Sequence, residues 1–280
     1  MGTYLRIVIA ALAGLLALAH AHAGEWVEFP GRGAVTLKAF VLKPEGAGPF
    51  PAVVALHGCA GLGNAKGVIN PRHADWGERL AAAGYIVVFP ESFVSRGLGS
   101  QCTVRDREVR SRDRANDAFA TAEWLAARPD VNKAKIGLLG WSNGGITTLR
   151  ATNRGQAPRG VEFAQAVAFY PGCTALLKRG YAPRVPVTIL HGLADDWTPA
   201  APCRKFGTAR FIAAEPCRAL PGVRFIGYDG AYHDFDHPNL PLRTRKAAFS
   251  ANGTGVVHIG TNAEAREDAI RRVMGIFGAM

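Results

Sequence analysis

The feature that most constrains the fold of this chain is the alternation of short apolar runs with segments of helical periodicity. Continuous apolar runs bounded by Pro or Gly are typical of strands buried on both faces of a parallel sheet. Such runs lie at 51–57, 85–89, 135–139, 165–169, 187–190 and 223–228. Helices are expected between or after them at 73–83, 104–127, 143–152, 200–214 and 263–277. After an initial hairpin at 25–29 and 34–42, this order predicts an α/β protein with a mainly parallel sheet and helices on both faces.

Residues 24–280 are expected to form a single domain. The chain is 48% hydrophobic and 20% charged, so it can bury a full core, and disordered, collagen-like and coiled-coil classes are excluded. Domains built on an open sheet commonly exceed about 200 residues. No linker, internal repeat or low-complexity tract divides this one.

Residues 1–23 have the pattern of a secretory signal. Arg6 is their one charge, an apolar run follows at 7–19, and the small-residue triplet Ala-His-Ala ends at Ala23. This order predicts cleavage after Ala23 and export to the periplasm or the medium. The apolar run is shorter than the roughly 20 residues of a membrane-spanning helix, which leaves an uncleaved signal anchor as the alternative. No integral membrane segment is expected after cleavage.

The net charge of +11 is strongly basic, and only Arg6 leaves with the predicted signal. A basic excess favours anionic surfaces or acidic substrates as partners. The densest basic cluster, residues 105–114, also contains acidic residues at Asp106, Glu108 and Asp113. Mixed charges at helical spacing predict a solvated helix face. No nucleic-acid motif accompanies the charge, so no nucleic-acid partner is expected.

The strongest chemical signal is a GxSxG motif at residues 140–144, placed between an apolar strand and a helix. A sharp strand-to-helix turn forces the serine into a strained backbone, and the flanking glycines remove Cβ atoms that would collide with the neighbouring elements. The motif in this context predicts that Ser142 is a nucleophile at the carboxyl end of the sheet.

A nucleophilic serine needs a histidine base and an orienting acid, which in this arrangement follow later in the chain, the acid first. The strand at 187–190 leads to Asp195 and Asp196, and the strand at 223–228 leads to His233. The acid is therefore one of the two adjacent aspartates. His233 also has an alternative interpretation as a metal ligand together with Asp234, Asp236 and His237. Gly230 and Pro238 argue against the helix that would align His233 with His237.

The tetrahedral intermediate of acyl transfer needs two backbone donors. The N–H of Asn143, directly after the nucleophile, is one candidate, and the N–H of Cys59 in the loop after the strand at 51–57 is the other. His57 is expected to support this loop rather than to act in catalysis. A dinucleotide site is disfavoured because the glycines at 58, 61 and 63 give GxxGxG rather than GxGxxG. No cofactor and no metal are expected.

The chain has five cysteines, and export would permit disulfides. Cys59 and Cys102 follow neighbouring strands at the carboxyl edge, and so do Cys173 and Cys203, which predicts these two bridges. A Cys203–Cys217 bridge is disfavoured, because 14 mostly helical residues span up to about 21 Å and a disulfide needs α-carbons within about 7 Å. Cys217 is expected to be free.

Several ordered motifs together resemble the dienelactone hydrolase-like branch of the α/β-hydrolases. They are HGCAGL at 57–62, PESFVSRG at 90–97, GWSNGG at 140–145, YPGC at 170–173, HGLADDWTP at 191–199 and GAYHDFD at 230–236. The resemblance implies the α/β-hydrolase fold and a triad of Ser142, Asp195 and His233, with Asp195 preferred over Asp196. Dienelactone hydrolases proper have a cysteine nucleophile held by a glutamate of the HG loop. Here the nucleophile is a serine and the loop has no glutamate, which argues against dienelactones themselves as substrates.

The expected function is that of an exported serine hydrolase that cleaves ester or lactone bonds of small substrates through an acyl-enzyme. Residues 170–186 are too few for a multi-helix cap domain, so the site should be open. A peptidase of the same fold is the first alternative. A catalytically inactive hydrolase-fold domain that binds an anionic surface is the second.

Overall fold

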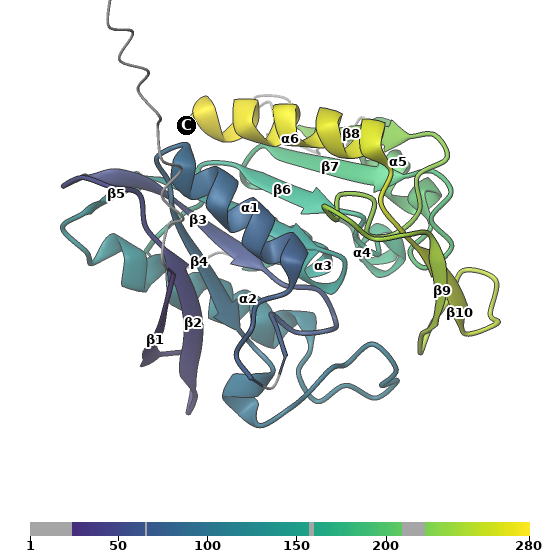
Figure 1. Ribbon diagram of the computed structural model, residues 1–280, viewed down its shortest axis with the longest axis horizontal. Coiled ribbons are helices and arrows are strands. Elements are labelled where there is room, and N and C mark those ends of the chain that lie inside the picture. Colours follow the sequence, from purple (N-terminus) through teal and green to yellow (C-terminus); the bar gives the residue numbers. More distant parts are fainter. Residues whose placement is uncertain (1–23, 65, 157–159, 209–221) are drawn as a thin grey trace, which may run out of the picture.

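A computed structural model describes residues 24–64, 66–156, 160–208 and 222–280 of the chain. The predicted signal at 1–23 and Cys217 lie outside the described residues. Within them, an eight-stranded sheet has the order β1-β2-β4-β3-β5-β6-β7-β8 (Figure 1). The strands are β1 (Glu25–Pro30), β2 (Thr36–Leu42), β3 (Phe50–Leu56), β4 (Ile86–Glu91), β5 (Val131–Trp141), β6 (Ala166–Phe169), β7 (Val187–Gly192) and β8 (Val223–Tyr228). The pairs β1–β2 and β2–β4 are antiparallel and the others are parallel, which confirms the predicted α/β class.

Helices cover both faces of the sheet, as predicted (Figure 1). One face packs against α1 (Pro71–Ala82) and α6 (Ala263–Gly278). The other packs against α2 (Ser111–Ala126), α3 (Asn143–Thr152) and α5 (Ala200–Thr208). Short helical segments are α4 (Thr174–Arg179), η1 (Val94–Arg96) and η2 (Arg154–Gln156).

The apolar run of β3 explains why both layers form. Val53 and Ala55 are fully buried and belong to the cluster that contains Trp76 of α1, whereas Val54 and Leu56 belong to the cluster that contains Leu149 of α3. Successive strand residues point to opposite faces. A strand that is apolar at every position can therefore bury both faces only between two helical layers.

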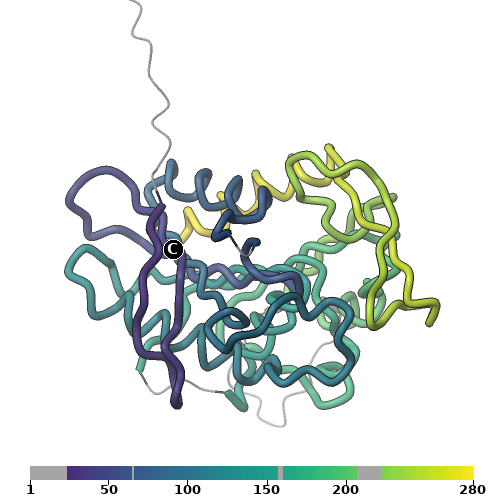
Figure 2. Tube along the Cα trace, turned by 60° about the horizontal axis from the view of Figure 1, so that its bottom comes forward, coloured from purple at the N-terminus to yellow at the C-terminus, as the bar shows by residue number. Residues whose placement is uncertain are grey.

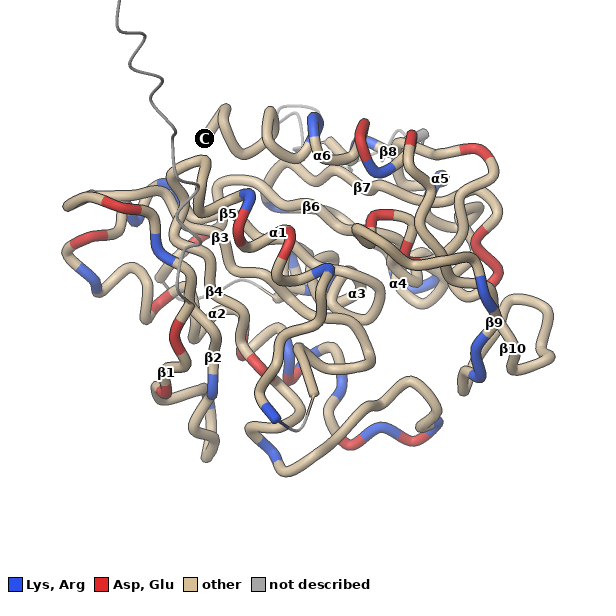
Figure 3. The backbone as a smooth tube through the Cα atoms, in the orientation of Figure 1, with Lys and Arg blue, Asp and Glu red and all other residues tan. Residues whose placement is uncertain are grey.

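The expected helix at 104–127 is wrong at its start, because α2 begins at Ser111. The Asp113 carboxylate accepts the backbone N–H of Arg110, which adopts an extended conformation and ends the preceding loop. The solvated helix face expected at 105–114 is therefore wrong as well. Residues 105–110 form a loop of alternating charge (Figure 3), and Arg114 on α2 is fully buried.

A second, two-stranded sheet, β9 (Arg243–Lys246) with β10 (Val256–Ile259), was not predicted. Its first strand reads RTRK, which has no apolar alternation to identify it. The hairpin lies at the opposite end of the molecule from β1–β2 (Figure 2). It is held by the backbone N–H of His258, which donates to Asp196, and by the N–H of Ala248, which donates to Cys102.

The segment between β6 and β7 contains the short helix α4, so no cap domain is inserted there. The described part of the chain contains no helix with the length and apolar character needed to cross a membrane.

Two disulfides anchor loops at the carboxyl edge of the sheet. Cys59 is bonded to Cys102, with α-carbons 4.9 Å apart, and Cys173 is bonded to Cys203, with α-carbons 5.1 Å apart. These are the two pairs predicted from the sequence. The first bridge ties the loop after β3 to the loop that leads to α2.

Candidate active site

Ser142 lies at a strained turn between β5 and α3. Its φ of 52° and ψ of −112° place a non-glycine residue in a region that side chains rarely adopt. A Cβ on Gly140 would lie 2.4 Å from the carbonyl oxygen of Gly144, and one on Gly144 would lie 2.0 Å from that of Leu56. The glycines of the motif therefore allow β5, α3 and β3 to approach closely around the serine, the geometry expected of a nucleophile elbow.

The loop after β3 faces this serine. A Cβ on Gly58 would lie 3.8 Å from the Cβ of Ser142, so the two segments are in direct apposition. The backbone N–H groups of Cys59 and Asn143 belong to these two apposed segments, and neither takes part in a hydrogen bond identified among the described residues. That both could serve as donors to an oxyanion stays a prediction.

His233 and Asp195 form a buried pair at the same edge. His233 Nδ1 lies 2.7 Å from Asp195 Oδ2, and the histidine is 1% exposed. Burial opposes ionisation of Asp195, but the charge of His233 and hydrogen bonds from His233 and Thr198 outweigh it and lower the pKa of the carboxyl. Asp195 is therefore an ionised acceptor that fixes the Nδ1–H tautomer of His233.

The other ring nitrogen of His233, Nε2, is buried and has no hydrogen-bond partner among the described residues. Phe169, the last residue of β6, and Tyr170, which follows it, contact Ser142 and His233 respectively. The N–H of Ser142 donates to the carbonyl of Phe169, and the ring of the next residue, Tyr170, lies 4.4 Å from the ring of His233. Trp197 packs on His233 as well, at 4.7 Å. The imidazole thus contacts two aromatic rings, and one of its nitrogens has no partner among the described residues.

Asp196 does not reach His233. Its Oδ2 lies 2.7 Å from Nδ1 of His258, and its Oδ1 accepts the backbone N–H of the same residue. The two adjacent aspartates thus have separate partners, one in the His233 pair and one in the hairpin. Of the two aspartates, Asp195 is thus the one that pairs with His233.

The other acidic residues near His233 belong to a separate buried network. Arg72 of α1 pairs with Asp234 and donates to the hydroxyl of Tyr170 at 3.0 Å. Asp236 accepts hydrogen bonds from Tyr170 at 2.5 Å and from the indoles of Trp76 and Trp141. Asp234 and Asp236 are therefore engaged with a guanidinium and with neutral donors rather than arranged around a common point. Among the described residues no cluster of His, Cys, Asp or Glu could hold a metal ion.

Glu91, at the end of β4, supports the loop that faces Ser142. Its carboxylate accepts the N–H groups of Leu62 and Phe93 and lies 3.1 Å from His57 Nε2, and His57 Nδ1 lies 2.8 Å from the carbonyl oxygen of Gly58. Burial would raise the pKa of Glu91, but the neighbouring imidazole and these hydrogen bonds lower it well below its ordinary value. His57 thus supports the loop, as expected.

Sequence reasoning missed the supporting role of Glu91, and it missed Arg72 and Arg114. Glu91 sits at the carboxyl end of a predicted strand, next to the loop after β3, and that position was the available signal. Arg72 and Arg114 lie on helices among other charged residues, where spacing does not distinguish a buried guanidinium from an exposed one.

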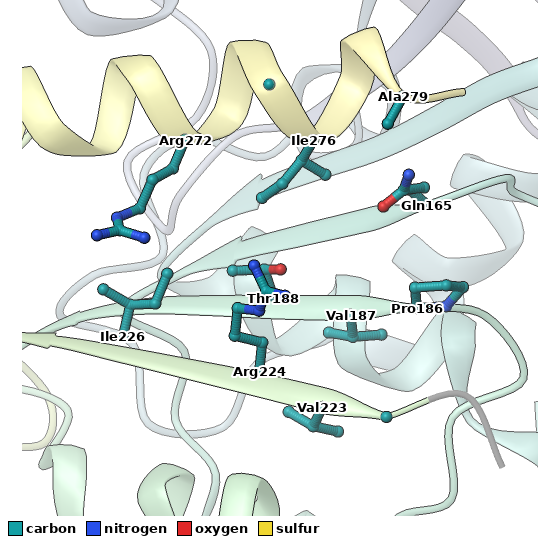
Figure 4. Close-up of a pocket in the computed structure, with 12 residues that line it drawn as sticks. Gln165, Pro186, Val187, Thr188, Val223, Arg224, Ile226, Arg272, Ile276 and Ala279 are labelled. Atoms are coloured by element: carbon teal, nitrogen blue, oxygen red, sulfur yellow. The ribbon is translucent and has the colours of Figure 1, made fainter. Parts of the chain in front are cut away.

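Two cavities have different relations to the site. One of about 650 Å³ lies under α6 and is lined by the first residues of β7 and β8, Val187 and Val223 (Figure 4). It is at the amino edge of the sheet, away from Ser142. Another, of about 520 Å³, is bordered by Asn143, Ile146 and the charged loop 105–111. It adjoins the turn that contains Ser142.

The sheet order and the strained serine turn define a hydrolase of the α/β-hydrolase class. The family model of the dienelactone hydrolase family matches residues 37–280. The chain therefore belongs to the dienelactone hydrolase family.

Solved structures share the fold at low sequence identity. A putative dienelactone hydrolase from Klebsiella pneumoniae has 19% identity and a TM-score of 0.66, and the match covers 92% of this chain and 99% of that one. Esterase 2 of Thermogutta terrifontis, phosphoramylated by tabun, has 18% identity and a TM-score of 0.58 over 91% and 94% of the two chains. A probable dipeptidyl-aminopeptidase B from Fusarium vanettenii is 34% identical over 88 residues, which span 31% of this chain and 10% of that protein.

Proposed function

We propose that the protein is an exported serine hydrolase that cleaves ester or lactone bonds of small substrates. The observation that carries the proposal is the buried Asp195–His233 pair, whose free Nε2 lies on the same sheet edge as the strained Ser142. That combination of nucleophile, base and orienting acid is what acyl transfer from a serine requires.

In the proposed mechanism, Ser142 Oγ attacks the acyl carbon while His233 Nε2 takes its proton. The histidine then delivers the proton to the leaving alcohol, and a water completes the second half by the same route. Asp195 holds the tautomer and stabilises the imidazolium. The N–H groups of Cys59 and Asn143 donate to the oxyanion.

The direct test is hydrolysis of p-nitrophenyl acetate by the purified protein and by Ser142→Ala. The variant should lose at least about 10³-fold in kcat, because the attacking oxygen is removed. Labelling by a fluorophosphonate probe should disappear with it, and tabun's reaction with the Thermogutta esterase motivates this reagent. Equal rates for the two proteins would overturn the assignment. An unlabelled wild-type protein would favour the inactive binding module.

A peptidase is the second candidate, because a probable dipeptidyl-aminopeptidase is similar over 88 residues. Matched p-nitrophenyl esters and p-nitroanilides separate the two functions. An esterase should prefer the ester by a far larger ratio in kcat/KM than the difference in leaving-group reactivity explains. A preference for dipeptidyl anilides would assign the peptidase function instead.

An open site is proposed together with small, soluble substrates, since only α4 stands between β6 and β7. Activity should show no rise at the critical micelle concentration of a long-chain ester. Such a rise would indicate a lid. A screen of small esters and lactones would then define the acyl group.

Export of a single domain, residues 24–280, completes the proposal. The two disulfides support an oxidising compartment. Mass determination of the protein from cell fractions should find Gly24 at its start, outside the cytoplasm. An intact leader on membrane-associated protein would instead identify a signal anchor.

A further inference from the structure

Arg114 is a fully buried cation directly behind the loop that faces Ser142. It lies in the first turn of α2, and its relative exposure is 0%. Its guanidinium lies 5.0 Å from the centre of the Phe93 ring, whose edge also packs against His57. Arginine side chains are almost never fully buried unless they are paired.

The two terminal nitrogens of Arg114 bind the two segments that carry the proposed oxyanion donors. One donates to the carbonyl oxygen of His57, at 2.8 Å, two residues before Cys59. The other donates to the side-chain oxygen of Asn143, the residue whose backbone N–H is the second donor. One rigid, planar group therefore joins the two segments that carry the proposed donors.

The positive charge of Arg114 is not cancelled by a direct ion pair. No carboxylate among the described residues lies within ion-pair distance of it. Asp117 pairs with Arg96, and Glu91 lies beside His57. Burial lowers the pKa of Arg114 to about 10, partly opposed by Glu91 and Asp117, so the group stays protonated at neutral pH.

We infer that Arg114 is a positioning residue of the oxyanion hole, which aligns the Cys59 and Asn143 amides and adds a fixed positive charge behind them. This inference rests on the proposed serine hydrolase function. A preorganised cation in a water-excluded site favours the charge that develops in the transition state over the neutral ester. The effect of its loss should therefore appear in kcat rather than in KM.

The first test compares Arg114→Met and Arg114→Lys with the control Arg150→Met. Arg150 lies on α3 and donates to Ser111 on α2, but it contacts neither His57 nor Asn143. Hydrolysis of p-nitrophenyl acetate should fall 10- to 100-fold in kcat for Arg114→Met, with KM within about threefold. Arg114→Lys keeps the positive charge but loses the planar guanidinium with its two terminal nitrogens. Its kcat should therefore lie between those of Arg114→Met and wild type. Arg150→Met should stay within about twofold. Normal kcat in Arg114→Met with a lowered melting temperature would reduce the residue to a structural role.

A second variant keeps the inference testable if Arg114→Met does not fold. Asn143→Ala removes the acceptor but retains the backbone N–H, and kcat should again fall about tenfold or more. In Arg114→Ala, millimolar guanidinium should restore at least tenfold of the lost rate without changing wild type. Absence of rescue in a folded variant, together with normal kcat in Asn143→Ala, would overturn the inference.

Failure of this inference can be distinguished from failure of the proposed function. Wild type and Ser142→Ala are measured in the same assay and with the same fluorophosphonate label. If wild type is inactive and unlabelled, the proposed function fails. If wild type is active and labelled but the Arg114 variants react as fast as wild type, only the role of Arg114 fails.

Discussion

The two sides of Ser142 are held in place by different means. On the donor side, which comprises residues 57–62, Glu91, Arg114 and Asn143, buried charges bind mainly backbone groups and a disulfide anchors the loop. On the base side, which comprises residues 195–198, 233–236, Arg72 and Tyr170, buried charges bind mainly other side chains.

The difference follows from what each side must orient. In the proposed mechanism the donor side presents peptide N–H groups to the substrate, so its supports must fix the backbone itself. In the same mechanism the base side presents the imidazole of His233, so its supports must fix a side chain and its tautomer. A substitution on the base side should therefore act chiefly on the proton transfer, and one on the donor side on both loop stability and turnover.

The largest effect is expected for Asp195→Asn on the base side. The amide cannot accept the Nδ1 proton of His233 in the same way, so the unreactive tautomer becomes favoured, and kcat should fall about 10³- to 10⁴-fold. Measurement of kcat with p-nitrophenyl acetate tests this. Asp196→Asn is the matched control, because its partner is His258, and it should lose less than about tenfold. Equal losses in the two variants would remove the distinction between the adjacent aspartates.

Removal of the Cys59–Cys102 bridge should produce the next largest effect. The bridge spans a sequence separation of 43, for which the chain-entropy model gives about 4 kcal/mol of unfolding free energy. The double Cys→Ala variant should therefore unfold at lower denaturant concentration and also lose turnover. The Cys173–Cys203 bridge spans 30 residues and serves as the control. Its removal should cost similar stability with little change in kcat. Unchanged activity without the Cys59–Cys102 bridge would show that this bridge does not support the donor side during turnover.

Glu91→Gln should have a smaller effect on stability. The charged acceptor of two backbone N–H groups becomes a neutral one, which should cost about 1 kcal/mol per hydrogen bond and about 2 kcal/mol in all. For a chain of this size that corresponds to a fall in Tm of roughly 2–4 °C per kcal/mol. Thermal unfolding of the two proteins at neutral pH measures the difference.

The Glu91 carboxyl should also make the free energy of unfolding depend on pH. The pKa of Glu91 is lowered on folding, so its contribution to stability is present above the unfolded pKa, about 4.3, and is lost as pH falls below it. The free energy of unfolding of wild type should therefore drop more steeply between about pH 5 and pH 3 than that of Glu91→Gln. Parallel curves would show that Glu91 is not a source of acid sensitivity.

The smallest effect is expected for His258→Gln at the outer limit of the base side. The side chain of His258 is 42% exposed, and a solvent-accessible pair with Asp196 contributes less than about 1 kcal/mol. Because the backbone N–H of His258 still donates to Asp196, the hairpin should remain docked. Differential scanning calorimetry should detect a shift of a few degrees or less. A large loss of kcat in His258→Gln would show that the β9–β10 hairpin also helps to position the base side.

The sequence alone determined the sheet, its two helical layers and the position of Ser142. Continuous apolar runs leave a strand no stable place except between two covering layers, and Gly140 is required by its close approach to Gly144 in the same turn. These constraints act on residues that are close in sequence, so the pattern of residue types along the chain is enough to predict them. The two disulfide pairs were accessible for a related reason, because parallel strands bring their following loops to one edge.

Tertiary structure alone decided which charges are buried and what they bind. Arg114 lies in a charge-rich stretch that predicts solvent exposure, yet the approach of α2 to the loop after β3 buries it against His57 and Asn143. The hairpin β9–β10 likewise has no local signal and forms because Asp196 and Cys102 supply its partners. The energy of a buried charge depends on neighbours that are distant in sequence, and periodicity along the chain has no information about them.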